Sequence, residues 1–269
     1  MSNPVEDYSL LVSAVRGAGE LAMQYFGTRH TVWQKNDGTP VSEADIAVDT
    51  LLRRRLAETR PDYGWLSEET EDDLTRLTRR RVWVVDPIDG TRAFINGLPH
   101  FCHAVALVEC GRPIMAALYN PALDEFYEAS VGRGAKLNGS SIRVSTQAEI
   151  AGCRMVAFAP MFRHPAWRES WPEMEIIQRD SVAYRIAMVA NGSADAAFGL
   201  NSKNDWDLAA ADLIVTEAGG IMSSHDGSTL EYNRETPIQL SFLAAGPNLH
   251  AALKARVGYV KLDPRRSAQ

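Results

Sequence analysis

Hydrophobic residues fall at helical spacing in two early segments of the chain. In the first segment they recur every three or four residues among polar ones, which predicts an amphipathic helix. These positions are Leu11, Val15, Ala18, Ala22 and Tyr25. The second expected helix begins at Ser42 and runs to about Glu58. Its candidate buried positions include Ile46, Leu52 and Leu56.

Short apolar runs rich in β-branched residues predict strands through the rest of the first half. The expected strands cover residues 31–34, 65–67, 82–85, 105–108, 114–118 and 125–129. Turn residues over 111–113 and 120–124 separate the last three, so we expect these strands to form an antiparallel meander. A polar loop over residues 35–40 connects the first strand to the second helix.

Strand-like and helix-like segments alternate in the second half of the chain. The expected strands cover residues 154–159, 194–200 and 240–245, and the expected helices cover 181–190, 206–218 and 249–257. This pattern predicts a mixed α/β fold. We expect an N-terminal α+β subdomain over residues 1–145, with the antiparallel sheet, and a C-terminal α/β subdomain over residues 146–269. The two are expected to form a single compact globular unit.

The most informative stretch is Trp83-Val84-Val85-Asp86-Pro87-Ile88-Asp89-Gly90-Thr91. Pro87 has no N–H to donate, so we expect the buried strand to end at Asp86 and the chain to leave the sheet there. Asp86 and Asp89 then lie at the carboxyl end of a strand, where α/β proteins place ligands. Gly90 and Thr91 open a possible helix, whose free N–H groups attract an anion.

Carboxylates for a hard cation and N–H groups for a phosphate within six residues indicate metal-assisted phosphate chemistry. The alternative is a simple tight turn, because Asp, Pro and Gly are ordinary turn residues.

Further acidic residues lie where other strands end and helices begin. They are Glu68 and Glu69, Asp45, and Asp207. Each has a purely structural alternative. Asp45 and Asp207 occupy helix starts, where a carboxylate caps free N–H groups. Glu68 and Glu69 precede further acids at residues 71–73, so they could belong to a solvated acidic loop.

Composition narrows the function classes. The chain has 269 residues, of which 45% are hydrophobic, so it can bury one large core or two modest ones. A formal net charge of −6 disfavours non-specific nucleic-acid binding.

We expect neither a signal peptide nor a membrane span, for which about 20 apolar residues are needed. Three unclustered cysteines (Cys102, Cys110 and Cys153) predict reduced, buried thiols in a cytoplasmic protein.

Three motifs together resemble the inositol monophosphatase family: Glu68-Glu69, the Asp86-to-Thr91 stretch, and Trp206-Asp207 through Gly219-Gly220. They occur in the family's order, from Lys35 to Gly220, and so cover most of the chain. The resemblance implies a layered α/β/α/β/α sandwich like that of fructose-1,6-bisphosphatase, with the main metal motif in the N-terminal subdomain. It also implies a homodimer and lithium-sensitive, Mg²⁺-dependent hydrolysis of a small phosphomonoester.

The resemblance further assigns roles to matching residues. Two or three Mg²⁺ ions would be held by Glu68, Asp86, Asp89, Asp207 and the backbone carbonyl of Ile88. The catalytic set would be Thr91, Asp45, Glu68 and Asp89, with Asp45 hydrogen-bonded to Thr91 and water activated by the metal as the nucleophile, without a phosphoenzyme. Backbone N–H groups of Gly90 and Thr91 would hold the phosphate. Lys35 matches a family lysine near the site, and Glu69 is the neighbour of a ligand.

The substrate-binding part of the match is weaker. A family glutamate that contacts the sugar has no counterpart in residues 199–205, so the non-phosphate half of the substrate is expected to contact Asn201, Lys203 or Asp205 there, together with Arg92 and Asp207. Arg185 is a further candidate for contact with the substrate. The alternative is that Arg185 forms an ion pair at the surface.

We favour a myo-inositol phosphate as the substrate. A 3′(2′),5′-bisphosphate nucleotide, histidinol phosphate and a fructose-bisphosphatase-like substrate stay open, because relatives with these activities share the metal motifs. A haloacid-dehalogenase-type phosphatase is disfavoured, since its two aspartates are separated by one residue rather than two. From another class of function, a non-catalytic protein-interaction role also stays open.

Overall fold

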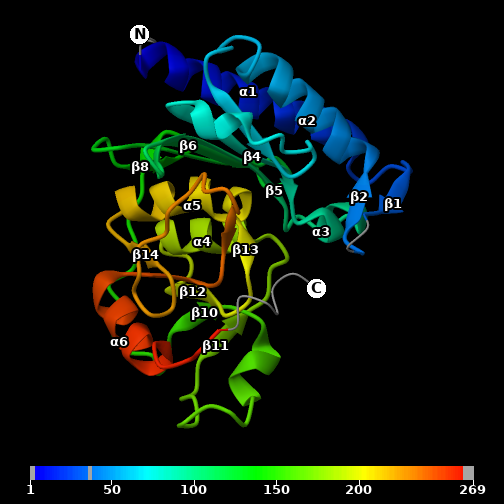
Figure 1. The fold of residues 1–269 in the computed structure, drawn as a ribbon. Helices are drawn as coiled ribbons and strands as arrows, with labels where there is room; N and C mark the ends of the chain where they lie inside the picture. Colours follow the sequence, from blue (N-terminus) through cyan, green and yellow to red (C-terminus); the bar gives the residue numbers. More distant parts are fainter. Residues whose placement is uncertain (1–3, 36–37, 263–269) are drawn as a thin grey trace.

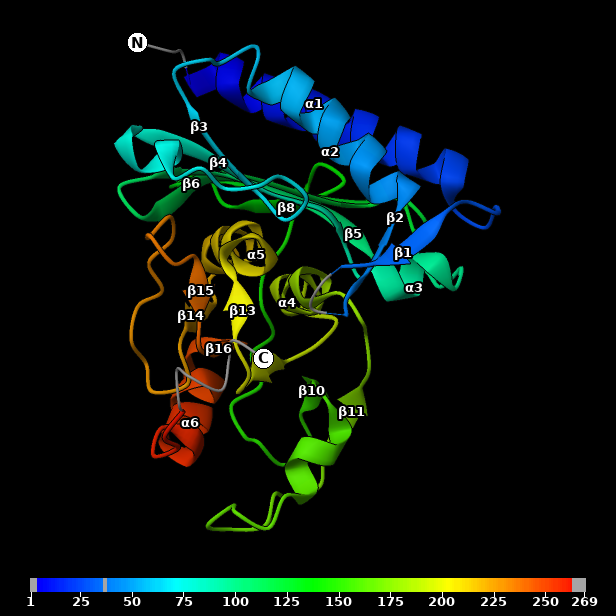
Figure 2. The ribbon, with the colours of Figure 1, turned by 45° about the vertical axis from the view of Figure 1, so that its right-hand side comes forward.

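The structure is a computed structural model that describes residues 4–35 and 38–262. Figures 1 and 2 show five layers. Helices α1 (Pro4–Tyr25) and α2 (Glu43–Leu56) cover one face of a seven-stranded sheet. Helices α4 (Val182–Ala190) and α5 (Asp205–Glu217) lie between that sheet and a five-stranded one, and α6 (Pro247–Val257) packs outside. The expected α/β/α/β/α sandwich is therefore confirmed.

The seven-stranded sheet has the order β3-β4-β5-β6-β7-β8-β9. Its strands are β3 (Gly64–Ser67), β4 (Arg81–Asp89), β5 (Cys102–Glu109), β6 (Arg112–Asn120), β7 (Glu125–Ser130), β8 (Ala135–Leu137) and β9 (Ser140–Ser141). Strands β5, β6 and β7 pair antiparallel, which confirms the predicted meander. Strand β3 runs parallel to β4, so the chain segments after Ser67 and Val85 emerge side by side.

Strand β4 continues past the point where the sequence predicted its end. Asp86 pairs with Ala104 and Asp89 pairs with Cys102, so one extra residue of β4 is accommodated in a bulge. The prediction that the chain leaves the sheet at Pro87 is therefore wrong. A bulge lets the strand pass a residue that cannot donate to the ladder.

The five-stranded sheet has the order β11-β10-β12-β16-β14. Its strands are β10 (Arg154–Val156), β11 (Glu175–Ile177), β12 (Ala196–Gly199), β14 (Ile221–Ser223) and β16 (Phe242–Ala245). Strands β10, β11 and β12 are parallel, so their carboxyl ends meet at one edge of the sheet.

Short elements complete the fold. Two-stranded sheets are formed by β1 (Val32–Gln34) with β2 (Pro40–Ser42), and by β13 (Lys203–Asn204) with β15 (Ile238–Gln239). The remaining helices are α3 (Thr91–Ile95) and the 3₁₀ turns η1 (Thr75–Thr78) and η2 (Ala159–Arg163). The strands that were not predicted have two or three residues each, which leaves little pattern to recognise; they are β2, β8, β9, β11, β13, β14 and β15. Residues 36–37 of the predicted polar loop lie outside the described residues.

Two further expectations need correction. Leu52 and Leu56 are buried as predicted, but Ile46 is 40% exposed because it lies on the outer face of α2. Cys102 and Cys153 are buried and unpaired, whereas Cys110 is exposed in the β5–β6 turn. The subdomain boundary between residues 145 and 146 stays a prediction. Among the described helices, none has the length and apolar character that crossing a bilayer requires.

Candidate active site

The bulge in β4 turns two aspartates to the same face of the sheet. Directly paired residues share a face, and Ala104 and Cys102 lie two residues apart on β5, on one face. Their partners Asp86 and Asp89 therefore face the same side, toward α4 and α5. Without the bulge, residues three apart would point to opposite faces.

Asp86 is a buried carboxylate without a full set of partners. It is 1% exposed, and its Oδ1 has no hydrogen-bond partner among the described residues. Burial raises the pKa of Asp86 well above its usual range, and repulsion from Glu68, Asp89 and Asp207 adds to this. A buried acceptor of this kind is costly unless a cation compensates it.

Asp89 is oriented by the start of α4. Its Oδ2 accepts hydrogen bonds from the Ser181 hydroxyl at 2.6 Å and from the backbone N–H of Ala183 at 2.5 Å. Burial raises the pKa of Asp89, while these two hydrogen bonds act in the opposite direction. Ser181 also caps α4 by accepting from Tyr184 N at 3.0 Å. Ser181 was not among the predicted site residues, although its place at the start of a predicted helix was an available signal.

Thr91 and Asp45 are in contact, as expected. Thr91 Oγ1 lies 3.0 Å from both Asp45 Oδ1 and the backbone carbonyl of Ile88. The other carboxylate oxygen of Asp45 accepts from the N–H and hydroxyl of Ser42 at 2.8 and 2.6 Å. Asp45 therefore caps α2 and also holds the Thr91 hydroxyl; a catalytic role for the two stays a prediction.

Gly90 allows the sharp turn between β4 and α3. Its φ is +95°, which favours glycine. A Cβ at this position would lie 2.7 Å from the carbonyl oxygen of His100 and 3.2 Å from Ser181. Any side chain would therefore push α3 away from α4, which carries the contacts to Asp89.

Glu68 and Glu69 share a lysine. Lys35 Nζ lies 2.9 Å from Glu68 Oε1 and 2.6 Å from Glu69 Oε1. Burial raises the pKa of Glu69 to about 7, although Lys35 opposes this rise. For Lys35, burial alone would lower the pKa, but the two carboxylates outweigh burial and raise it. The family lysine thus lies at the acidic cluster.

Asp207 reaches the cluster from the first turn of α5. Its Oδ2 accepts from the backbone N–H of Asn204 at 2.9 Å, so it is also a helix cap. Burial raises the pKa of Asp207, followed by repulsion from Asp89 and Glu68. The four predicted acidic ligands therefore lie within electrostatic reach of one another, brought together from β3, β4 and α5.

Two expectations about the rim are wrong. Asp205 is fully buried and accepts from the N–H of Asn233 at 2.6 Å and from Gln239 Nε2 at 2.8 Å, so it faces away from a substrate. Arg185 is not a surface ion-pair residue, because its guanidinium donates to the carbonyls of residues 179 and 180. Burial lowers the pKa of Arg185, and the nearby charge of Asp89 acts in the opposite direction.

The remaining predicted substrate residues lie on nearby elements. Arg92 is exposed on α3, Asn201 is exposed after β12, and Lys203 is half-buried on β13. The charge of Lys203 acts on Asp207. Their contact with a substrate stays a prediction.

The donor set suits a hard divalent cation. Among the described residues, no three His, Cys, Asp or Glu side chains converge on one point as a bound ion requires. The unpartnered Asp86 Oδ1 and the mutual repulsion of Asp86, Asp89 and Asp207 nevertheless leave negative charge uncompensated. Carboxylate and carbonyl oxygens are the ligands that Mg²⁺ prefers. The residues therefore fit the ion.

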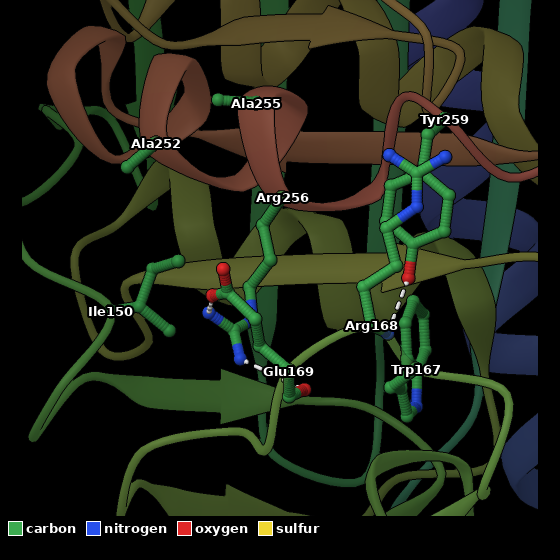
Figure 3. A pocket seen from close by; sticks show the side chains of 8 residues that line it. All are labelled: Ile150, Trp167, Arg168, Glu169, Ala252, Ala255, Arg256 and Tyr259. Carbon is green, nitrogen blue, oxygen red and sulfur yellow. Dashed lines mark hydrogen bonds and ion pairs between the residues drawn. The ribbon is translucent and has the colours of Figure 1, made fainter.

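A second hollow of the surface lies between α6 and the segment before β11, and none of the acidic cluster lines it (Figure 3). Arg256 donates there to the backbone carbonyls of Glu169 and Ser170. The Arg168 guanidinium lies 3.8 Å from the ring centre of Tyr259. These contacts occupy the hollow's polar groups, so the acidic cluster is the better candidate for the active site.

Comparison with known proteins agrees with this site. The chain matches the model of the inositol monophosphatase family over residues 3–260. It is 35% identical to the Nus factor SuhB of Xylella fastidiosa, with 96% of this chain and 98% of the relative covered. It is 34% identical to the histidinol-phosphatase of Chlorobaculum parvum, with 92% and 96% covered. The solved IMPase of Thermotoga maritima superposes with a TM-score of 0.77 at 29% identity, covering 91% of this chain and 94% of that one.

The layered fold and the acidic cluster define a phosphatase of the generally metal-dependent type that acts on small phosphorylated molecules. The chain belongs to the inositol monophosphatase family.

Proposed function

We propose that the protein is a Mg²⁺-dependent phosphomonoesterase whose substrate is a myo-inositol phosphate. The observation that carries the proposal is the acidic cluster itself: Asp86 Oδ1 is buried with no hydrogen-bond partner in the described part of the chain, and Asp86 is repelled by Glu68, Asp89 and Asp207. Such a cluster is stable only with protons or a cation to offset its charge.

Each part of the site has a proposed role. Glu68, Asp86, Asp89, Asp207 and the carbonyl of Ile88 hold two or three Mg²⁺ ions, which supply Lewis-acid activation of water and neutralise phosphate charge when bound. Asp45 accepts from the Thr91 hydroxyl and so orients the Thr91 oxygen toward a water proton. The N–H groups of Gly90 and Thr91 contact the phosphate.

A specific observation favours a second candidate, a substrate with two anionic groups such as a 3′(2′),5′-bisphosphate nucleotide. Within the described residues, neither Arg179, Arg185 nor Lys203 forms an ion pair with a carboxylate. Arg179 and Arg185 flank the start of α4 that contacts Asp89, and Lys203 leads into α5. Cations left unpaired near a phosphate site suit a second phosphate.

The test is phosphate release with saturating Mg²⁺ from four substrates: inositol 1-phosphate, histidinol phosphate, 3′-phosphoadenosine 5′-phosphate and fructose 1,6-bisphosphate. We expect the highest kcat/KM for inositol 1-phosphate, loss of activity with a chelator, and inhibition by lithium. A clear preference for the bisphosphate nucleotide would support the second candidate. Release from none of the four by the folded protein would contradict the phosphatase proposal and favour the protein-interaction role that the name of the Xylella relative suggests.

We also propose that the protein is a cytoplasmic homodimer, by likeness to its family. Three unpaired cysteines suit a reducing compartment. Sedimentation of the purified chain at micromolar concentration is expected to give twice the monomer mass, and a monomer would contradict the proposal.

A further inference from the structure

Arg76 is a buried cation that joins two loops far apart in the sequence. It is only 1% exposed. Its Nε and Nη2 donate to the carboxylate of Asp72 at 2.7–3.1 Å. Its Nη1 donates to Oδ1 of Asn233 at 2.7 Å and to the carbonyl of Arg234 at 3.0 Å, and Nη2 donates to the carbonyl of Glu235 at 3.3 Å. All five N–H groups are thus satisfied, which offsets the cost of burying the charge.

The first of these loops carries Glu68. Asp72 follows Glu68 by four residues, and its Oδ1 also accepts from the N–H of Leu74 at 3.0 Å. The backbone of Arg76 packs directly on the start of β3, because a Cβ on Gly64 would lie only 2.9 Å from Arg76 Cβ. Asp72 is therefore a half-buried partner of a buried cation, and the predicted alternative of a solvated acidic loop is wrong for this residue.

The same loop is anchored on its other side by α2. The hydroxyls of Ser67 and Thr70 donate to Asp49 at 2.5 and 2.9 Å. These residues bracket Glu68 and Glu69. The position of Glu68 relative to β4 and α2 is thus fixed within the first half of the chain.

The second loop, residues 233–235 before β15, contacts the start of α5. Asn233, which accepts from Arg76, donates its own N–H to Asp205 Oδ2 at 2.6 Å. Gln239 on β15 donates to the other oxygen of Asp205 at 2.8 Å. Asp205 is the first residue of α5, two positions before Asp207. A continuous chain of hydrogen bonds therefore runs from the Glu68 loop through Arg76 to the helix start that carries Asp207.

We propose that Arg76 is a positioning residue that sets the separation of Glu68 and Asp207, and with it the affinity of the acidic cluster for Mg²⁺. The inference rests on the proposed function for the identity of the ion. Arg76 contacts none of the cluster's acids; it acts through Asp72 on one side and through Asn233 and Asp205 on the other. Outer contacts of this kind orient ligands and tune metal affinity.

The chain offers a matched control in Arg154. Its guanidinium donates to both oxygens of Asp195 and to the carbonyls of Gly192 and Ser193, at 2.7–3.2 Å. Arg154 therefore donates to the same kinds of acceptor as Arg76, one carboxylate and backbone carbonyls, although it is more exposed. It joins β10 to the turn before β12, away from the acidic cluster. A loss of stability alone is expected from Arg154→Lys.

The experiment is calorimetric titration of Mg²⁺ into the wild type, Arg76→Lys and Arg154→Lys, after circular dichroism has confirmed their folds. We expect Arg76→Lys to weaken Mg²⁺ binding at least about tenfold and to lower kcat at saturating substrate with KM little changed. Arg154→Lys is expected to keep wild-type Mg²⁺ affinity. Equal Mg²⁺ affinity in all three proteins would overturn the role of Arg76, and so would an equal weakening in both variants.

A milder variant keeps the test usable if Arg76→Lys does not fold. Asn233→Gly removes the side-chain acceptor of Arg76 and tolerates the φ of +61° at this position. We expect Asn233→Gly to weaken Mg²⁺ binding about threefold, which is less than the effect expected from Arg76→Lys. Unchanged binding would overturn the proposal. A wild type that binds no Mg²⁺ would contradict the proposed function and overturn the Arg76 proposal with it. Normal wild-type binding with an unaffected Asn233→Gly protein would overturn the Arg76 proposal alone.

Discussion

The two halves of the molecule bring their acids to the same place by different means. In the first half, one strand supplies Asp86 and Asp89, and a single bulge beside Pro87 turns both to one face. In the second half, Asp207 is placed by a helix start, and that helix is positioned by a buried network through Asp205 and the loop before β15. The face to which Asp86 and Asp89 point is thus set locally, although Asp89 also contacts the start of α4. The position of Asp207 depends on contacts between distant segments.

The two halves are therefore sensitive to different kinds of substitution. A local bulge keeps its geometry as long as a few neighbouring residues are kept, because the ladder on both sides enforces it. A helix start held by a network moves when any member of the network changes. We therefore expect changes in the first half to act all or none, and changes in the second half to act by degrees.

The largest expected effect comes from neutralising one acid in each half. Asp89→Asn and Asp207→Asn should each lower kcat roughly 10³-fold, because each removes a charge from the cluster while keeping the size of the side chain. Phosphate release measured beside circular dichroism checks this. Asp226→Asn, an exposed aspartate near α6, is the control and should be unaffected. Near-normal rates in either variant would remove that aspartate from the site.

The second largest effects are expected when alanine replaces a glycine at the end of a strand in each half, which adds the same methyl group at both positions. Gly90→Ala should lower the free energy of unfolding by roughly 2 kcal/mol or more, because alanine disfavours a φ of +95° and its Cβ would meet the His100 carbonyl. At Gly199 the new Cβ would meet two side chains, the ring edge of Phe242 at 2.8 Å and Asn201 Oδ1 at 3.3 Å, so Gly199→Ala should cost about 1 kcal/mol. Urea unfolding of both variants is the measurement, and equal losses would contradict the comparison.

The smallest expected effect is a pH dependence of stability that arises from His103, the side chain that contacts the bulge. His103 is fully buried, and its Nδ1 is hydrogen-bonded to the carbonyl of Pro87, while Nε2 has no partner among the described residues. Burial lowers the pKa of His103 to about 4, against a partial rise from that hydrogen bond. A depressed folded-state pKa means that the unfolded chain binds the proton more readily, so stability falls as the pH drops through the range from 6.5 to about 4.

This linkage predicts that the contribution of His103 to the free energy of unfolding falls by about 1 kcal/mol between pH 7.5 and pH 5.5, and comparison with a variant that lacks the imidazole separates this contribution from that of the buried acids. His103→Asn keeps a donor near the Pro87 carbonyl but cannot be protonated there. It should be less stable than the wild type at pH 7.5, because asparagine leaves a cavity, yet lose less stability on acidification. Chemical unfolding at the two pH values measures both quantities, and parallel losses in the two proteins would refute the assignment to His103.

The contrast between the halves also explains how much could be predicted from the sequence. The meander, the helices and the acids of the β4 stretch follow patterns among residues that are neighbours along the chain, and these were found. The continuation of β4 through Pro87 was missed, because a bulge depends on the partner strand. Asp205 was misjudged and Arg76 went unnoticed, because only the folded chain shows that residues 72, 76, 205 and 233 meet.

The bulge between Asp86 and Asp89 has a consequence for how the chain can change over generations. Strand geometry depends on whether the number of intervening residues is odd or even, so adding or removing one residue there would send Asp89 to the face beneath α1 and α2. Replacing Ile88 by another apolar residue of similar size preserves that parity and fills the same place in the core beneath α1 and α2. Over evolution, this segment should accept such conservative exchanges and reject insertions and deletions, whereas the exposed β5–β6 turn can vary in length.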